Sequence, residues 1–201
     1  MKVIILGGFL GSGKTTALLQ FARYLTSISD PLRKNKVVIL ENEVGEIGID
    51  DQYLRGSGYT VDTLFAGCAC CTVSGELVSA LIKIVNDMDP EWIVIETTGI
   101  AYPRSMRENL QQSLNIDSRI VILTDCSRWK RLRIPMDSLL RGQIEGSDAV
   151  LINKTDLVSE DVILDVERDI LDIEPNAKIT RISALSEISS EIWQQVAGVL
   201  S

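Results

Sequence analysis

Glycine, lysine and hydroxyl residues follow the first apolar run of the chain in a pattern suited to holding phosphate. The run 7–16 reads Gly-Gly-Phe-Leu-Gly-Ser-Gly-Lys-Thr-Thr and satisfies the Walker A spacing. Its glycines allow backbone N–H groups to curl around an anion. Lys14 is expected to reach the β- and γ-phosphates of a nucleotide, and Thr15 to offer its hydroxyl to Mg²⁺. The predicted nucleotide-binding residues of this loop are Gly11, Ser12, Gly13, Lys14, Thr15 and Thr16.

The segment Asn153-Lys154-Thr155-Asp156 has the residue types that read guanine in GTPases. The Asp156 carboxylate can accept hydrogen bonds from the N1–H and the exocyclic amine of guanine, whereas adenine lacks both donors at these positions. The stem of Lys154 can cover the face of the base. A polar turn of four residues is a weak signal alone, because ordinary surface turns have similar compositions.

Position along the chain strengthens this interpretation, because five polar segments each begin where a predicted strand ends. Open α/β sheets bind ligands at the carboxyl ends of their strands. The segments are 7–16, 96–99, 124–125, 153–156 and 183–185. Within the predicted site, Glu96 suits a contact to Mg²⁺-bound water and the Gly99 N–H suits the γ-phosphate. Ser183 and Ala184 suit the guanine O6 through a backbone N–H.

Short β-branched runs alternate with longer periodic runs, which predicts a mostly parallel sheet with helices on both faces. The expected fold is a three-layer α/β P-loop NTPase fold, forming a single domain over 1–201. The expected strands are Val3–Leu6, Lys36–Leu40, Thr60–Phe65, Trp92–Ile95, Arg119–Leu123, Ala149–Ile152 and Lys178–Ile182. The expected helices are 14–26, 75–87, 160–173 with Ser159 as N-cap, and 188–200.

Three of the four cysteines lie together in Cys68-Ala69-Cys70-Cys71. Three thiolates suit a soft or borderline ion such as Zn²⁺ or Cu(I), and a tetrahedral zinc needs a fourth ligand. The acidic stretch that contains Glu41 and Glu46 could supply it. Because only three thiolates are present and histidine is absent, an exchangeable site is favoured over a permanent one. A buried or redox-active cysteine group is the alternative.

Composition restricts the classes of function that the chain can serve. A formal net charge of −8 argues against general binding to nucleic acid or to an anionic membrane. No segment approaches the roughly 20 apolar residues of a membrane span, so a cytoplasmic protein is expected. The absence of histidine excludes imidazole as a general base. The basic cluster 128–133 is interpreted as a solvated helix face, and a contact in trans with a partner or a phosphate is the alternative. Trp92, Cys126 and Trp193 are expected to be core residues.

Taken together, the motifs resemble the CobW-type metallochaperone GTPases, relatives of UreG and HypB, over almost the whole chain. The similar segments are the P-loop at 7–16, the first switch at 41–50, the metal motif at 67–71, the Walker B and second switch at 96–99, and the run 143–157 that contains Asn-Lys-x-Asp-Leu. The resemblance implies that GTP binding and hydrolysis are coupled to loading or delivery of a transition metal or metal cofactor.

The resemblance also implies cofactors, partners and catalytic residues. GTP and Mg²⁺ are expected, with Asp50 as a candidate for the Mg²⁺ and γ-phosphate shell. Zn²⁺ is the expected cargo, with Co²⁺ or Ni²⁺ as alternatives. A client metalloprotein or assembly protein is the expected partner, and a nucleotide-dependent homodimer could complete the site. The expected Mg²⁺ ligands are Thr15, Asp50 and Glu96, the catalytic set adds Lys14, and the transition-metal set is Cys68, Cys70, Cys71, Glu41 and Glu46.

Members of this family usually continue into a C-terminal domain, often with a histidine-rich stretch. The 201 residues are expected to correspond to the GTPase domain alone, without that second domain. Intrinsic hydrolysis is expected to be slow, because the chain has no histidine base. Two other functions stay open: an ATP-dependent P-loop kinase, which the segment 153–156 disfavours, and a nucleotide-binding metal or redox sensor without significant turnover.

Overall fold

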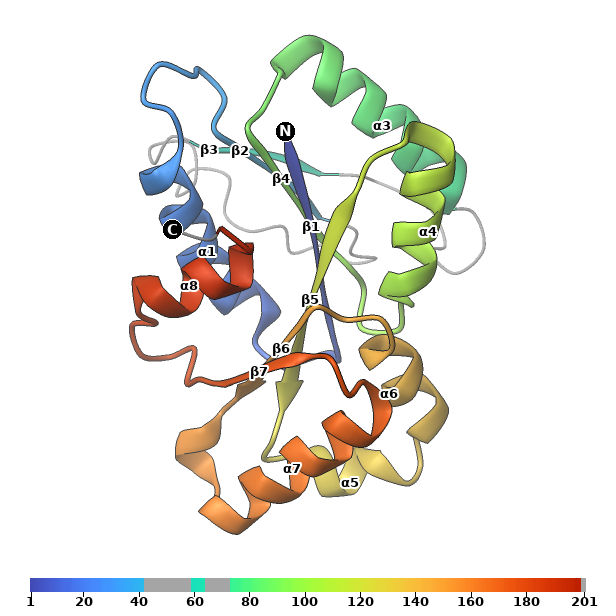
Figure 1. Ribbon diagram of the computed structural model, residues 1–201, viewed down its shortest axis with the longest axis vertical. Helices are drawn as coiled ribbons and strands as arrows, with labels where there is room; N and C mark the ends of the chain where they lie inside the picture. The colour runs from blue at the N-terminus through green and yellow to red at the C-terminus, as the bar shows by residue number, and fades with distance from the viewer. Residues whose placement is uncertain (42–58, 64–72, 200–201) are drawn as a thin grey trace.

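The computed structural model describes residues 1–41, 59–63 and 73–199, and a central sheet of seven strands runs through it (Figure 1). The strand order is β3-β2-β4-β1-β5-β6-β7, and each neighbouring pair is parallel. The strands are β1 (Lys2–Gly8), β2 (Val37–Glu41), β3 (Tyr59–Thr63), β4 (Trp92–Glu96), β5 (Ser118–Asp125), β6 (Ala149–Asn153) and β7 (Lys178–Arg181). All seven predicted strands are therefore confirmed, with small shifts at their ends.

Helices cover both faces of the sheet (Figure 1). They are α1 (Lys14–Ile28), α3 (Val73–Met88), α4 (Pro103–Leu114), α5 (Trp129–Arg133), α6 (Asp137–Ile144), α7 (Glu160–Ile173) and α8 (Ser190–Ala197), with a short 3₁₀ turn η1 (Thr155–Leu157). Ser159 occupies the N-cap position of α7 as predicted, although its side chain makes no capping hydrogen bond. Among the described residues, no helix combines the length and apolar character needed to cross a membrane.

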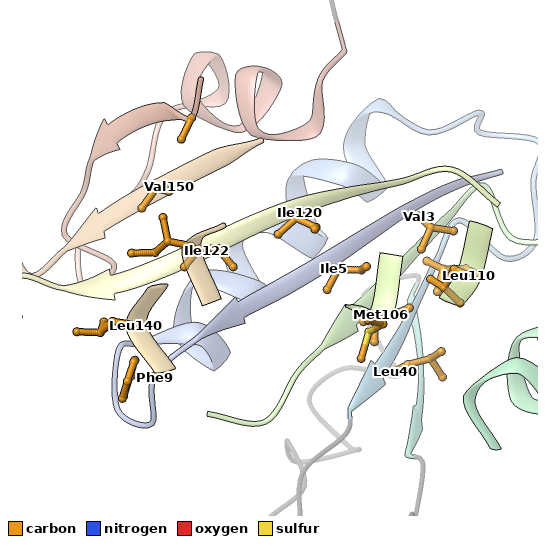
Figure 2. Close-up of a cluster of buried hydrophobic side chains, with 14 of the residues drawn as sticks. Val3, Ile5, Phe9, Leu40, Met106, Leu110, Ile120, Ile122, Leu140 and Val150 are labelled. Atoms are coloured by element: carbon orange, nitrogen blue, oxygen red, sulfur yellow. The ribbon is translucent and has the colours of Figure 1, made fainter. Parts of the chain in front are cut away.

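Alternation along each strand divides the interior into two cores, because successive strand residues point to opposite faces. Val3 and Ile5 of β1 pack in the core beneath α3, α4, α6 and α7, part of which is drawn in Figure 2. Ile4 and Leu6 pack in the other core, beneath α1 and α8. There the Phe21 and Trp193 rings stack with centroids 5.0 Å apart. The predicted three-layer α/β fold is confirmed.

Three helices, α4, α5 and α6, are not predicted by the apolar periodicity. Helix α4 buries only Pro103, Met106 and Leu110, so its apolar stripe is narrow and its sequence is otherwise polar. Helix α5 contains five residues, which is too short for a periodic pattern, and the buried face of α6 includes the polar Gln143 beside Leu140 and Ile144. Their packing against the sheet, rather than their sequence period, stabilises them as helices.

The central strand β1 lies between β4 and β5, at the point where the strand order reverses. From this point the chain proceeds to β2 and β3 on one side, and later to β6 and β7 on the other. Ligands of open α/β sheets bind in the crevice that such a reversal opens at the carboxyl ends of the strands. The segment after β1 is the predicted phosphate loop, so the topology places that loop at the centre of this edge.

Candidate nucleotide-binding site

The loop between β1 and α1 closes around the ammonium group of Lys14. The Lys14 Nζ donates hydrogen bonds to the backbone oxygens of Gly8 at 3.1 Å and Phe9 at 3.2 Å, and the side chain is buried. Helix α1 begins at Lys14 after Gly13, which adopts the left-handed conformation with φ of 96°. No side chain of the described chain caps this helix start, so its first-turn N–H groups are donors suited to an anion.

Thr15 and Glu96 meet at the head of α1. The Thr15 hydroxyl donates to Glu96 Oε1 at 3.3 Å, and Glu96 is the last residue of β4. Mg²⁺ in nucleotide sites is held by oxygen ligands such as one hydroxyl and one or two carboxylates. The pairing of this hydroxyl with a largely buried carboxylate therefore fits a Mg²⁺ site at the place that the sequence predicts.

Asn153 connects the predicted guanine segment to the phosphate loop and to the segment 183–185. Its side chain is buried, its Nδ2 donates to the Ser12 backbone oxygen, and its Oδ1 accepts from the Ala184 N–H, each at 2.8 Å. The Oδ1 also accepts from the Lys154 N–H at 2.8 Å. A buried amide with both ends hydrogen-bonded is held in one orientation. Asn153 thus fixes the phosphate loop and the segment 183–185 relative to the end of β6.

Lys154 makes a second connection across the same edge, to the end of β5. Its Nζ donates to Asp125 Oδ2 at 2.7 Å and to the Gly11 backbone oxygen at 2.8 Å. Burial raises the pKa of the Asp125 carboxyl, but the hydrogen bonds from Lys154 and Ser127 outweigh this effect and hold the pKa below its ordinary value. Asp125 therefore carries a negative charge at neutral pH that orients the lysine along the loop.

A cavity of about 300 Å³ opens beside Asp156. Asp156 is exposed, and the side chains of Leu157 and Leu185 are 62% and 89% exposed. Such solvent-facing leucines beside a carboxylate suit a flat base that needs apolar walls and a polar edge contact. The cavity is lined by Gly13, Thr16, Asn153, Lys154, Asp156, Leu157, Ser183, Ala184 and Leu185.

The sequence matches the profile of the CobW/HypB/UreG nucleotide-binding domain over residues 2–181. The chain belongs to the CobW/HypB/UreG family. That assignment confirms the family resemblance, and it agrees with the phosphate loop, the Thr15–Glu96 pair and the Asn153 connections described above.

Two relatives illustrate how much of the chain the similarity covers. The zinc-regulated GTPase metalloprotein activator 1 of Schizosaccharomyces pombe is 35% identical over 203 residues, covering 94% of this chain and 48% of that protein. The zinc chaperone YjiA of Escherichia coli K12 is 31% identical over 171 residues, covering 80% of this chain and 51% of YjiA. The chain spans about half the length of these relatives.

Solved structures show the same fold. The Zn(II)-bound YjiA GTPase from E. coli superposes with a TM-score of 0.68 at 19% identity, covering 100% of this chain and 63% of YjiA. HypB from Helicobacter pylori, in complex with nickel, superposes with a TM-score of 0.64 at 20% identity, covering 100% of this chain and 90% of HypB. These two structures therefore share the three-layer α/β fold of this chain.

The predicted transition-metal ligands of this family member lie mostly outside the described residues. Glu46 and the cluster Cys68, Cys70 and Cys71 fall in the undescribed ranges 42–58 and 64–72, and so does Asp50, the predicted Mg²⁺ ligand. The backbone of Glu41 ends β2 directly beside Glu96 of β4. Within the described ranges 1–41, 59–63 and 73–199, no group of three or more cysteine or acidic side chains could hold a metal.

Cys126 is confirmed as a packed core cysteine. The side chain is buried, and its Sγ donates to the Asn153 backbone oxygen at 3.0 Å. Burial, followed by the negative charge of Asp125, raises the pKa of the Cys126 thiol to about 11. The thiolate, not the thiol, binds metals and reacts with electrophiles. The Cys126 thiol is protonated at neutral pH and is therefore not suited to either role. Trp92 and Trp193 are buried as predicted.

The basic cluster 128–133 is not simply a solvated helix face, so that interpretation is wrong in part. The Arg128 Nη1 donates to the Leu10 backbone oxygen of the phosphate loop at 3.2 Å. Trp129 is buried, and its Nε1 donates to Asp169 at 2.7 Å. Only Lys130 and Arg131 of this cluster are exposed as expected. The error arises because the positive charges of the cluster do not indicate which of its residues contact a neighbouring loop or helix.

Gln20 is a site residue that the sequence motifs do not include. Its Nε2 donates to the backbone oxygens of Ala184 at 2.9 Å and Ser186 at 3.0 Å, and its Oε1 accepts from the Ile188 N–H at 2.9 Å. Helix α1 therefore holds the segment after β7 through one side chain. The sequence carries little signal for this role, because the residues one helical turn from Gln20 form a mixed face of Thr16, Ala17, Arg23 and Tyr24.

Replacing Gln20 with glutamate is expected to weaken binding of guanine nucleotides by about five- to tenfold. The carboxylate keeps the acceptor for Ile188 but loses both donors, so it would face the carbonyl oxygens of Ala184 and Ser186. The hydrolysis rate at saturating GTP should change little, because the phosphate loop keeps its contacts. Fluorescent GDP and GTP titrations measure the affinity, and single-turnover phosphate release measures the rate.

The matched control is Ser27→Ala on the same helix, where an exposed hydroxyl bonds only the Tyr24 oxygen within its own turn. This variant should bind nucleotide as the unsubstituted protein does. Equal nucleotide affinity in the Gln20→Glu and Ser27→Ala variants would show that the Gln20 contacts do not hold the binding segment.

Proposed function

We propose that this domain binds GTP, hydrolyses it to GDP and phosphate, and uses its nucleotide state to control transition-metal binding for delivery to a client protein. The observation that carries the proposal is the Asn153 side chain. It ties the guanine-reading segment to the Ser12 oxygen of the phosphate loop and to the Ala184 N–H. One buried amide thereby sets the distance between the places where a base and its phosphates would bind.

Hydrolysis in this proposal depends on positioning and charge rather than on a histidine base. Lys14 would neutralise the β- and γ-phosphates, and the N–H groups at the start of α1 would bind the same oxygens. Thr15 and Glu96, with Asp50 as a further candidate, would hold Mg²⁺, which when bound supplies charge stabilisation at the phosphates. The Gly99 N–H would contact the γ-phosphate. A slow intrinsic rate follows, and a partner or homodimer would complete the site.

Guanine selection is assigned to the cavity beside Asp156. The Asp156 carboxylate would accept from the N1–H and amine of the base, and the Ser183-Ala184 backbone would donate to its O6. Support comes from the geometry: Ala184 N–H and Asn153 Oδ1 are 2.8 Å apart, so the segment 183–185 lies against the Asn-Lys-x-Asp turn. The exposed Leu157 and Leu185 would cover the apolar faces of the base.

The transition-metal part of the proposal is supported by the position of the strand that precedes the cysteines. Strand β3 ends at Thr63, five positions before Cys68, and α3 begins at Val73, two positions after Cys71. Strand β3 is in parallel register with β2, whose end at Glu41 lies beside Glu96. Thr63 therefore lies at the carboxyl ends of the strands, the same end at which Glu41 and Glu96 lie.

Zn²⁺ is the cargo that we propose, with Co²⁺ and Ni²⁺ as alternatives. The names of the relatives refer to zinc for YjiA and the activator, and the H. pylori HypB structure holds nickel. The proposed ligands are Cys68, Cys70 and Cys71, with Glu41 or Glu46 completing the set. A client metalloprotein in the cytoplasm is the proposed recipient, and the 201 residues are proposed to act as one GTPase domain.

Metal affinity is expected to differ by about 5- to 150-fold between the GDP and GTP states, the usual range for coupled sites. A γ-phosphate with Mg²⁺ orders switch loops, and hydrolysis releases them. Linkage requires that the metal change GTP affinity by the same factor. Zn²⁺ and Co²⁺ titrations with no nucleotide, GDP and a non-hydrolysable GTP analogue measure the difference. Binding should also weaken as pH falls, because protons compete for the thiolates.

The control variants test the metal site separately from its coupling to the bound nucleotide. Changing Cys68, Cys70 and Cys71 together to serine should abolish tight metal binding, whereas Cys126→Ala should leave it intact, because the Cys126 thiol is buried and protonated. Unchanged binding in the triple-serine variant would remove the proposed site. Equal affinity in all three nucleotide states would remove the coupling while leaving the site.

A further inference from the structure

Helix α6 sends one buried polar side chain to the segment that follows β4. Gln143 is 1% exposed, and its Nε2 donates to the Gly99 backbone oxygen at 2.8 Å. Burying an amide costs free energy unless a partner satisfies it, so a buried glutamine is held where that partner lies. Gln143 stands 44 residues along the chain from Gly99, so tertiary packing alone creates the contact.

Gly99 lies between this side chain and the phosphate loop. A β-carbon built at Gly99 would stand 2.7 Å from Leu10 N and 3.2 Å from Leu10 Cα, so the two backbones are in direct contact. Thr97 extends the β4 pairing by donating to Leu6 at 2.9 Å, and Ala101 closes a turn by donating to Thr98 at 3.2 Å. The Gly99 peptide is therefore confined by Leu10 and by Gln143.

A second contact from α6 supports the same segment. Gly142 sits inside the helix, where glycine is less favourable than alanine. A β-carbon there would stand 2.2 Å from Cε1 and 2.4 Å from Cδ1 of Tyr102, so the tyrosine ring occupies that space. Adjacent residues of α6 thus hold both ends of the segment 99–102, one by a hydrogen bond and one by ring packing.

We propose that Gln143 is a positioning residue for recognition of the γ-phosphate. By holding the Gly99 carbonyl, it fixes the backbone on which the γ-phosphate contact depends, without touching the nucleotide itself. The inference rests on the proposed GTPase function, in which the Gly99 N–H meets the γ-phosphate. GDP has no γ-phosphate, so the contribution of Gln143 is confined to the triphosphate state.

The test replaces Gln143 with methionine, which has a similar shape but no donor. Affinity for a non-hydrolysable GTP analogue should fall by about five- to tenfold, while affinity for GDP should change by less than about twofold. The rate of single-turnover GTP hydrolysis should fall by at least about tenfold. Fluorescent nucleotide titrations give the two affinities, and thermal unfolding shows whether each variant is folded. Arg141→Ala, an exposed change on the same helix, is the control and should leave both affinities unchanged.

A second variant covers the case in which the methionine form does not fold. Gly142→Ala favours the helix but displaces the Tyr102 ring, so it should also lower affinity for the GTP analogue more than for GDP. The inference is overturned if a folded variant loses affinity for both nucleotides equally, or for neither. If the unsubstituted protein hydrolyses GTP, such a result refutes the role of Gln143 alone. If the unsubstituted protein binds no guanine nucleotide, both the proposed function and the role of Gln143 are refuted.

Discussion

Replacing Lys14 with alanine is expected to lower the rate of GTP hydrolysis by about two to three orders of magnitude. The ammonium lies within the loop, bonded to the oxygens of Gly8 and Phe9, next to the N-terminus of α1. In the proposed mechanism Lys14 is the side chain whose positive charge neutralises the β- and γ-phosphates, beside the Mg²⁺ that Thr15 and Glu96 would hold. The measurement is phosphate release in a single turnover at saturating GTP, together with nucleotide affinity, which should also weaken.

One further variant separates the charge of Lys14 from its hydrogen bonds, and a second variant is a control at a distant lysine. Lys14→Gln keeps N–H donors for the carbonyls of Gly8 and Phe9 but removes the charge, so its rate should fall nearly as far. Lys178→Ala, at the opposite edge of the sheet, should hydrolyse GTP normally because this exposed residue begins β7. Full activity in the Lys14→Ala variant would mean that the loop does not bind phosphate as proposed.

Replacing Asp156 with asparagine is expected to move base preference from guanine to xanthine by about 10²-fold or more. The carboxylate accepts twice from guanine, whereas an amide offers one acceptor and one donor, which match the N1–H and the 2-oxygen of xanthine. Asp156 is exposed beside the cavity, so the substitution should leave folding intact. Competition among GTP, XTP and ATP for a fluorescent nucleotide measures the preference.

The matched control for this change is Asp161→Asn, in the exposed first turn of α7. It removes the same charge five positions further along the chain and should retain guanine preference. Tighter binding of ATP than of GTP by the unsubstituted protein would refute the assignment of guanine specificity. That result would support the kinase alternative.

Much of the fold can be predicted from the sequence, because buried parallel strands are short runs of β-branched residues. All seven strands and the helices α1, α3, α7 and α8 follow from apolar patterns. The helices between Pro103 and Ile144 do not, because α4 carries a narrow apolar stripe, α5 is short and the buried face of α6 includes a polar glutamine. Their positions depend on the sheet that they cover.

The sequence by itself determined the chemistry of the predicted site. The phosphate loop, the Asn-Lys-x-Asp turn and the polar residues at strand ends are local patterns, whose residue types carry their chemistry wherever the chain places them. Their gathering at one edge also follows from the sequence, because parallel strands place their carboxyl ends together. Thr15 beside Glu96 and Asn153 beside Ala184 confirm that gathering in space.

Only the tertiary structure decided which side chains hold those motifs in place. Gln20, Asp125, Arg128 and Gln143 each bond a residue of the site that is 29 to 164 positions away in the chain. No periodicity or motif encodes such a pair, because the partner is mostly a backbone oxygen that every residue type offers equally. Which carbonyl lies within reach depends on how the helices pack on the sheet, and packing is a property of the whole folded chain.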